Sequence, residues 1–397
     1  MKKILIILSS LLIISCSNNS DSGENNSDNL SIENNYLGSE NCSEYSEGTT
    51  KGSGILSYVN WANYTSPKIL SCFQELTGIH IIQSYTTDDN MTKAKLLTGH
   101  TGYDVVEQGT LYLPFEIPAG AFEEIDTTRL SNYKNRNKSI YDKVAEINDP
   151  GNKYAIIYSY GTTGVGYNAI EAKARLPEGE VPNDWKYLFD SKYLSKFSDC
   201  GISFLDEPEQ VFGNLLYYLG KDPNSTNPND YKEAAQYLIK NVRPYLTYFD
   251  SNRYENDLAS GDLCLVMGYS GDVMRSYGMS KASHANTQIR YALPTSGASV
   301  FFDALMIPKG AKNIDAAYDF LNYTMNPKVA ATNSNFIYQP NAVEGSLPYM
   351  IDIFKDPNVN PTPEMIAKMY VIELWQPKLQ DYINRLWFSV KFGIDVK

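Results

Sequence analysis

Aromatic and acidic side chains are concentrated in segments that end or follow apolar, strand-like runs of this sequence. Carboxylates can neutralise an ammonium group, which is very costly to bury without a partner. Aromatic faces cover methylene groups and attract each cation by roughly 0.5–2 kcal/mol. These side chains together predict a site for an alkyl polyamine, in which methylenes join ammonium groups. The candidates are Trp61, Tyr64, Tyr269, Asp272, Phe301, Phe302 and Asp303.

Signals for other chemistries are weak. The glycine-rich segment 160–166 lacks the Gly-Lys-Ser/Thr end of a P-loop and the spacing of a dinucleotide-binding loop, so we interpret it as a tight turn. The three histidines have no metal-ligand spacing, and no Gly-x-Ser-x-Gly nucleophile elbow occurs. Asp272 and Asp303 alone would be compatible with acid–base hydrolysis. We therefore expect no cofactor and no metal, and an enzyme is the least favoured class.

The elements that must position these residues alternate between strands and helices from Gly54 onward. This order predicts crossover units and a parallel sheet covered on both faces. Ligands of such sheets bind beyond the carboxyl ends of the strands, where the candidate residues lie. Strands are expected at 55–60, 79–85, 103–106, 154–158, 164–168, 202–205 and 263–267, and helices at 67–76, 91–97, 208–219, 230–241, 314–325 and 365–370.

The N-terminal segment resembles an export signal. Lys2 and Lys3 precede an apolar run at 4–14, which is too short to span a membrane. Cys16 then completes a sequence similar to a bacterial lipobox, so residues 1–15 are expected to be removed and Cys16 to carry lipid. Residues 16–52 are mostly small and polar, which predicts a flexible tether. The protein is expected on the periplasmic or cell-surface side, held to the membrane by lipid only.

The net charge argues against one class of partner, and the number of cysteines indicates the compartment. The formal net charge of −12 makes nucleic acid a poor partner, because its binding requires lysine and arginine to neutralise phosphates. Apart from Cys16, an even number of cysteines remains, as expected in an oxidising compartment. The sequence alone leaves three pairings open among Cys42, Cys72, Cys200 and Cys264.

Several longer stretches resemble the periplasmic polyamine-binding proteins of ABC importers. The resemblance covers about 54–390 and is most specific in the stretches 162–168, 200–212, 218–226, 256–264 and 301–303. It implies an α/β fold of the two-lobed, hinged, type II periplasmic-binding-protein class, with the ligand held in a cleft between lobes. It also implies a binding protein rather than an enzyme, which delivers its ligand to the importer's permease.

Residue by residue, the resemblance implies a ligand site, a disulfide and lobe boundaries. It pairs Cys200 with Cys264, and a second bridge between Cys42 and Cys72 would pin the tether to the first helix. The first lobe is expected at 53–158 with 284–330, and the second at 159–283 with 331–397, with crossings near Tyr158, Ser283 and residue 330. The implied ligand-binding residues are Trp61, Asn63, Tyr64, Gly109, Gln210, Tyr269, Asp272, Phe301, Asp303 and Gln339.

This chain departs from the family pattern at some of these positions. Asn63 and Gln210 stand where the family has carboxylates, so two acidic groups have become neutral amides. Either the ligand carries less positive charge, or neighbours such as Glu107 and Glu209 compensate. Putrescine or spermidine is the leading ligand. The alternative ligands are another small amine or an amino-acid-like solute. The alternative function is that of a sensory binding protein.

Overall fold

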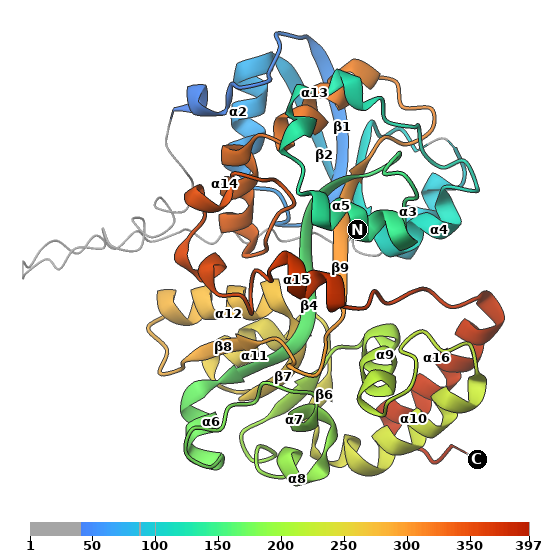
Figure 1. Ribbon diagram of the computed structural model, residues 1–397, viewed down its shortest axis with the longest axis vertical. Coiled ribbons are helices and arrows are strands. Elements are labelled where there is room, and N and C mark those ends of the chain that lie inside the picture. Colours follow the sequence, from blue (N-terminus) through green and yellow to red (C-terminus); the bar gives the residue numbers. More distant parts are fainter. Residues whose placement is uncertain (1–40, 87–88, 100, 397) are drawn as a thin grey trace, which may run out of the picture.

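The computed structural model describes residues 41–86, 89–99 and 101–396. The predicted signal peptide, Cys16 and the first part of the tether lie outside these residues. The described chain forms two lobes, one above the other in Figure 1, with strands β4 (Ile156–Asn168) and β9 (Val300–Met306) running between them. Within the described residues, no helix combines the length and apolar character needed to cross a membrane.

A single sheet path runs through both lobes, in the order β2-β1-β3-β9-β4-β7-β5-β6, with β8 paired to β4. The pairs β1–β2, β1–β3, β5–β6 and β5–β7 are parallel, whereas β9 and β4 pair antiparallel with all their neighbours. The expectation of a parallel sheet is therefore wrong for the strands that join the lobes, because each of them runs antiparallel to its immediate neighbours. The remaining strands are β1 (Gly54–Trp61), β2 (Ile79–Thr86), β3 (Val105–Gly109), β5 (Ile202–Phe204), β6 (Tyr248–Phe249), β7 (Leu265–Tyr269) and β8 (Ile289–Ala292).

Helices cover the sheet in each lobe (Figure 1). The first lobe contains η1 (Cys42–Tyr45), α2 (Pro67–Thr77), α3 (Asp89–Leu96), η2 (Thr110–Tyr112), α4 (Leu113–Glu116), η3 (Thr127–Arg129), η4 (Ser131–Asn135), α5 (Lys138–Ile147), α13 (Ile314–Thr324) and α14 (Pro327–Ile337). The second lobe contains α6 (Ala169–Arg175), α7 (Lys186–Phe189), α8 (Ser191–Leu194), α9 (Pro208–Tyr218), α10 (Pro228–Asn241), η5 (Arg243–Tyr245), α11 (Tyr254–Ser260), α12 (Ser270–Ala282) and α16 (Pro377–Phe392). The segment after α14 carries η6 (Leu347–Tyr349), η7 (Asp352–Lys355) and α15 (Pro363–Lys368).

Local signals in the sequence explain where many of these helices begin and end. Helix α2 starts with proline at its first position and ends at Gly78, whose φ of 85° is the left-handed conformation typical of a helix terminus. Helix α10 begins at Pro228, and the Asn227 side chain accepts a hydrogen bond from the backbone of its first turn. Both helices lie within two residues of their predicted bounds.

Two segments lie in a different lobe from the one predicted. Strand β8 pairs with the second-lobe end of β4, although 284–330 was assigned to the first lobe. Helix α14 contacts α2 and η1 of the first lobe, although 331–397 was assigned to the second. Only two residues separate α14 from α13, which is too short a connection to reach the other lobe. The chain therefore crosses within β4, within β9 and again between α14 and α16.

The glycine-rich segment is part of a strand, so the prediction of a tight turn is wrong. Residues 160–162 pair with β9, and β4 continues through 163–167 beside β7. The glycines serve close packing instead. A Cβ at Gly161 would lie 2.4 Å from the Phe301 ring, and one at Gly166 would lie 2.6 Å from the side chains of Val266 and Val273.

We expect Gly166→Ala to lower the free energy of unfolding by about 1–3 kcal/mol, because the added methyl group overpacks a well-filled interior. Gly52→Ala is the matched control, since its Cβ would meet the Ile79 side chain no closer than 3.1 Å and the Asp319 carboxylate at 3.8 Å. Chemical denaturation followed by circular dichroism measures both variants. Equal stability of the two would contradict the packing role of Gly166.

The last part of the predicted tether is folded against the first lobe. Cys42 forms a disulfide with Cys72 of α2, and the Tyr45 hydroxyl hydrogen-bonds to Thr332 of α14 at 3.1 Å. Both Cys42 and Tyr45 are buried. The prediction of a flexible segment up to residue 52 is therefore wrong from Asn41 onward, because a disulfide and one aromatic side chain supply the contacts that the polar composition concealed.

The second disulfide joins Cys200 to Cys264 in the second lobe, as the resemblance implied. Cys264 lies directly before β7, and its backbone N–H donates to the carbonyl of Gly201 at 3.0 Å. The bridge therefore links the starts of the neighbouring strands β5 and β7.

Candidate functional site

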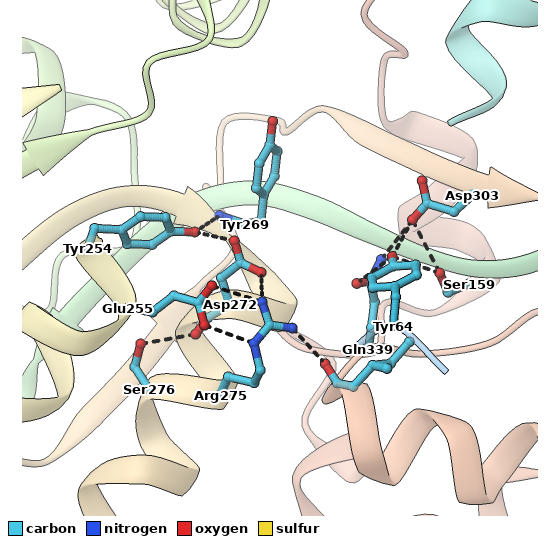
Figure 2. Close-up of polar contacts among 11 residues, drawn as sticks. Tyr64, Ser159, Tyr254, Glu255, Tyr269, Asp272, Arg275, Ser276, Asp303 and Gln339 are labelled. Atoms are coloured by element: carbon cyan, nitrogen blue, oxygen red, sulfur yellow. Dashed lines mark hydrogen bonds and ion pairs between the residues drawn. The ribbon is translucent and has the colours of Figure 1, made fainter. Parts of the chain in front are cut away.

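A first group of polar side chains surrounds Asp303 of β9 where the two lobes meet (Figure 2). Its Oδ2 accepts hydrogen bonds from the Tyr64 hydroxyl at 2.5 Å, the Ser159 hydroxyl at 3.2 Å and the Gln339 side-chain amide at 3.3 Å. The backbone of Asp303 pairs with Gly109, the last residue of β3. Three separate segments of the chain thus converge on one carboxylate.

Burial sets the electrostatics of this carboxylate. It raises the pKa of Asp303 to about 6, while the hydrogen bonds from Tyr64, Ser159 and Gln339 oppose the rise. The negative charge of Asp272 is a smaller part of this rise in pKa. A cation placed beside Asp303 would remove much of the cost of ionising it.

A second group is centred on Asp272 in the first turn of α12. Its Oδ1 pairs with the Arg275 guanidinium at 2.5 Å, and its Oδ2 accepts a hydrogen bond from the Tyr254 hydroxyl at 2.7 Å. Arg275 also pairs with Glu255 through two nitrogens, at 2.8 and 2.9 Å. Burial, and then the charge of Asp272, raise the pKa of Glu255, and Arg275 opposes this. The guanidinium therefore neutralises part of the negative charge that Asp272 would offer to a ligand.

Two aromatic rings lie next to these carboxylates. Tyr269 ends β7 and Phe301 lies near the start of β9, and their rings pack edge to face with centroids 5.2 Å apart. Phe302 points to the other face of β9, where it is buried against Tyr160, since successive strand side chains alternate between faces. Phe301 is therefore a candidate wall of the site, and Phe302 is a core residue.

Gln210 and its acidic neighbours lie at the start of α9. The Gln210 side-chain oxygen accepts a hydrogen bond from the Thr163 hydroxyl at 2.8 Å. Burial, and then the neighbouring Glu209, raise the pKa of Glu207 to about 8, and burial also raises the pKa of Glu209. Burial is the largest cause of the raised pKa of Tyr269, and the negative charges of Glu207 and Glu209 are the next largest. The two glutamates therefore influence the electrostatics of the aromatic part of the site.

The structure brings most of the predicted residues into these groups. Gln339 connects the Asp303 group to the Asp272 group. Its side-chain oxygen packs closely against α12, so that a Cβ added at Gly271 would lie 3.0 Å from it. Trp61 is half-buried at the end of β1, and Asn63 is exposed in the following turn with a φ of 58°. Among the described residues, neither forms a hydrogen bond or ring contact with the Asp303 or Asp272 group.

Sequence reasoning missed Arg275, Tyr254 and Glu255. The spacing of three residues between Asp272 and Arg275 would suggest an ion pair on a helix, but no helix was predicted in the segment that forms α12. Nothing in the sequence places Glu255 beside them. In the part of the chain that the structure describes, no group of three or more His, Cys, Asp or Glu side chains could hold a metal ion.

Comparison with known proteins gives consistent results. The chain is 36% identical over 335 residues to the putrescine-binding periplasmic protein PotF of Escherichia coli (strain K12), covering 84% of this chain and 90% of that protein. It is 35% identical over 340 residues to the putrescine-binding periplasmic protein SpuD of Pseudomonas aeruginosa (strain UCBPP-PA14), covering 85% of this chain and 92% of that protein.

A solved structure shares the fold. The spermidine/putrescine ABC transporter substrate-binding protein PotD of Streptococcus pneumoniae strain Canada MDR_19A superimposes with a TM-score of 0.74 at 23% identity. The match covers 86% of this chain and all of that one, which confirms the predicted two-lobed fold. The family model for bacterial extracellular solute-binding proteins matches residues 68–361. With its two lobes and the residues that converge between them, the chain belongs to the bacterial extracellular solute-binding protein family.

Proposed function

We propose that this protein is a lipid-anchored receptor that captures a polyamine outside the cytoplasm and delivers it to the permease of an ABC importer. The observation that carries the proposal is the Asp303 group, a buried carboxylate at the junction of the lobes. It lies close enough to Asp272 of the second lobe for the two charges to interact. The names of the relatives PotF and SpuD, both putrescine-binding, support the ligand class. The sequence around Cys16 supports the anchor and a periplasmic or cell-surface location.

A ligand that contacts both lobes can change how the lobes are arranged relative to each other. Asp303 extends from β9, which pairs with the first lobe, whereas Asp272 and Tyr269 belong to the second lobe. A ligand that contacts both sides stabilises the closed arrangement over the open one. Closure is then a hinge motion about the crossing strands.

The charges of the site favour a ligand with two separated ammonium groups. One ammonium would meet Asp303, beside Tyr64. The other would meet the Glu207 and Glu209 pair, whose negative charges raise the pKa of Tyr269 after the larger effect of burial. In this arrangement the glutamates compensate for the neutral Gln210. Asp272, already paired with Arg275, would contribute through the lone pairs that remain.

Titration calorimetry against putrescine, cadaverine, spermidine, agmatine and amino acids tests the ligand class. We expect heat with at least one diamine and none with amino acids. Binding of amino acids alone would favour the second candidate, a receptor for a less charged solute, which the neutral Asn63 and Gln210 support. Mass spectrometry of the ligand that co-purifies with the protein would identify the amine directly.

Diamine affinity should rise with pH between about 5 and about 8. In the unliganded protein, burial raises the pKa of Asp303 to about 6 and that of Glu207 to about 8. An ammonium ligand binds the ionised carboxylates, so protons compete with it below these values. Alkyl amines stay protonated throughout this range. The affinity should fall by up to about tenfold per pH unit for each competing proton.

Calorimetry in buffers of different ionisation enthalpy measures the protons released on binding. We expect release of one or more protons near neutral pH and less above the pKa of Glu207. An affinity that is unchanged across this range would contradict the assignment of Asp303 and Glu207 to the cation site.

A further inference from the structure

One face of α12 packs against a corner of the first lobe that is formed by residues 337–339. Gly271, Arg275 and Gly278 lie four and three residues apart, so they share this face of the helix. A Cβ at Gly278 would lie 2.5 Å from the Tyr338 hydroxyl, and one at Gly271 would lie 3.0 Å from the Gln339 side-chain oxygen. The two glycines thus allow the corner to approach on either side of Arg275.

The corner presents the C-terminal end of α14 to Arg275. This helix ends at Ile337, because Tyr338 adopts the left-handed conformation with a φ of 58°. The last carbonyls of a helix lack partners within it and carry partial negative charge, which attracts a cation. An Arg275 nitrogen donates to the Ile337 carbonyl at 3.3 Å. A side chain of the second lobe therefore caps a helix of the first.

The same guanidinium also holds the second-lobe carboxylates (Figure 2). It pairs with Asp272 at 2.5 Å and with Glu255 at 2.8 Å. On the other side of the corner, the Gln339 amide donates to Asp303 at 3.3 Å. The corner is thus connected to both candidate amine-binding carboxylates, by Arg275 on one side and by Gln339 on the other.

We propose that Arg275 is a positioning residue that latches the lobes together and couples closure to the orientation of Asp272. When the lobes are closed, its guanidinium bridges Asp272 and the end of α14. When they open, the bond to Ile337 is lost, and Asp272 loses its fixed link to the first lobe. The coupling of closure to an amine rests on the proposed function, whereas the latch itself does not.

Two variants weaken the latch in different ways. Arg275→Lys keeps the positive charge beside Asp272 and Glu255, but a single ammonium cannot reproduce the planar fork that reaches both carboxylates and the carbonyl. Gly278→Ala leaves every charge in place and inserts a methyl group against Tyr338. Lys281→Gln is the matched control, because it removes an exposed cation from the same helix and leaves the corner intact.

Small-angle scattering of the ligand-free proteins tests the latch without any amine. We expect both variants to have a larger radius of gyration than the wild type and the control. With saturating putrescine, we expect faster dissociation and an affinity lowered by about threefold to tenfold in both variants. Unchanged scattering and dissociation rates in both would overturn the latch. If wild-type protein does not bind putrescine, the proposed function fails, and the ligand-free scattering still decides whether the latch exists.

Discussion

Asp303→Asn is expected to weaken diamine binding by about 2–5 kcal/mol, which is about 30-fold to several thousandfold. The variant keeps the size of the side chain but removes the charge that one ammonium group requires in a buried position. Because burial raises the pKa of Asp303 to about 6, its ionised form is costly in the unliganded protein. The substitution should therefore not lower the melting temperature.

Calorimetry and thermal unfolding of the same preparation separate these two effects. Asp262→Asn provides the control, since Asp262 is exposed and lies outside the groups around Asp303 and Asp272. Wild-type affinity in Asp303→Asn would mean that the amine binds elsewhere. A large loss of stability would mean that Asp303 is primarily a structural residue.

Removal of the Cys200–Cys264 disulfide should lower the free energy of unfolding by about 4 kcal/mol. The bridge closes a loop with a sequence separation of 64, so its loss gives the unfolded chain much more conformational freedom. The double variant Cys200→Ser/Cys264→Ser, measured by chemical denaturation, tests this. Wild-type protein that has been reduced and alkylated loses both bridges and should be less stable still.

Ligand binding gives a second measurement on this variant. Neither cysteine lies in the groups around Asp303 and Asp272, so diamine affinity should change little under conditions where the double variant is folded. A variant as stable as the wild type would show that the loop is already ordered in the unfolded state.

The sequence predicted the elements whose signals are local. Helix α2 has proline at its start and Gly78 at its end, and its apolar spacing fits one buried face. Asp303 was selected from the sequence because it combines two kinds of information, a strand-like run and aromatic neighbours. The resemblance then added Gly109 and Gln339, which both meet Asp303 in the structure.

Features that depend on distant contacts could not be predicted. The glycines of β4 are equally suited to a turn and to close packing, and only the positions of Phe301 and Val266 decide between them. The local sequence around Asp272 contains Arg275 but not Glu255, which the fold brings beside it from α11. Polar composition likewise could not show that Tyr45 is buried against α14.

The disulfide between Cys42 and Cys72 has a mechanical consequence. Tension applied to the chain at residue 41 enters the protein next to Cys42, and the covalent bond carries it directly into α2. The load therefore does not reach β1 first, so pulling cannot peel that strand from the sheet. It also does not pass through β4 or β9, the strands that join the lobes. A pull on the N-terminal segment would thus be borne within the first lobe, away from the strands that join the two lobes.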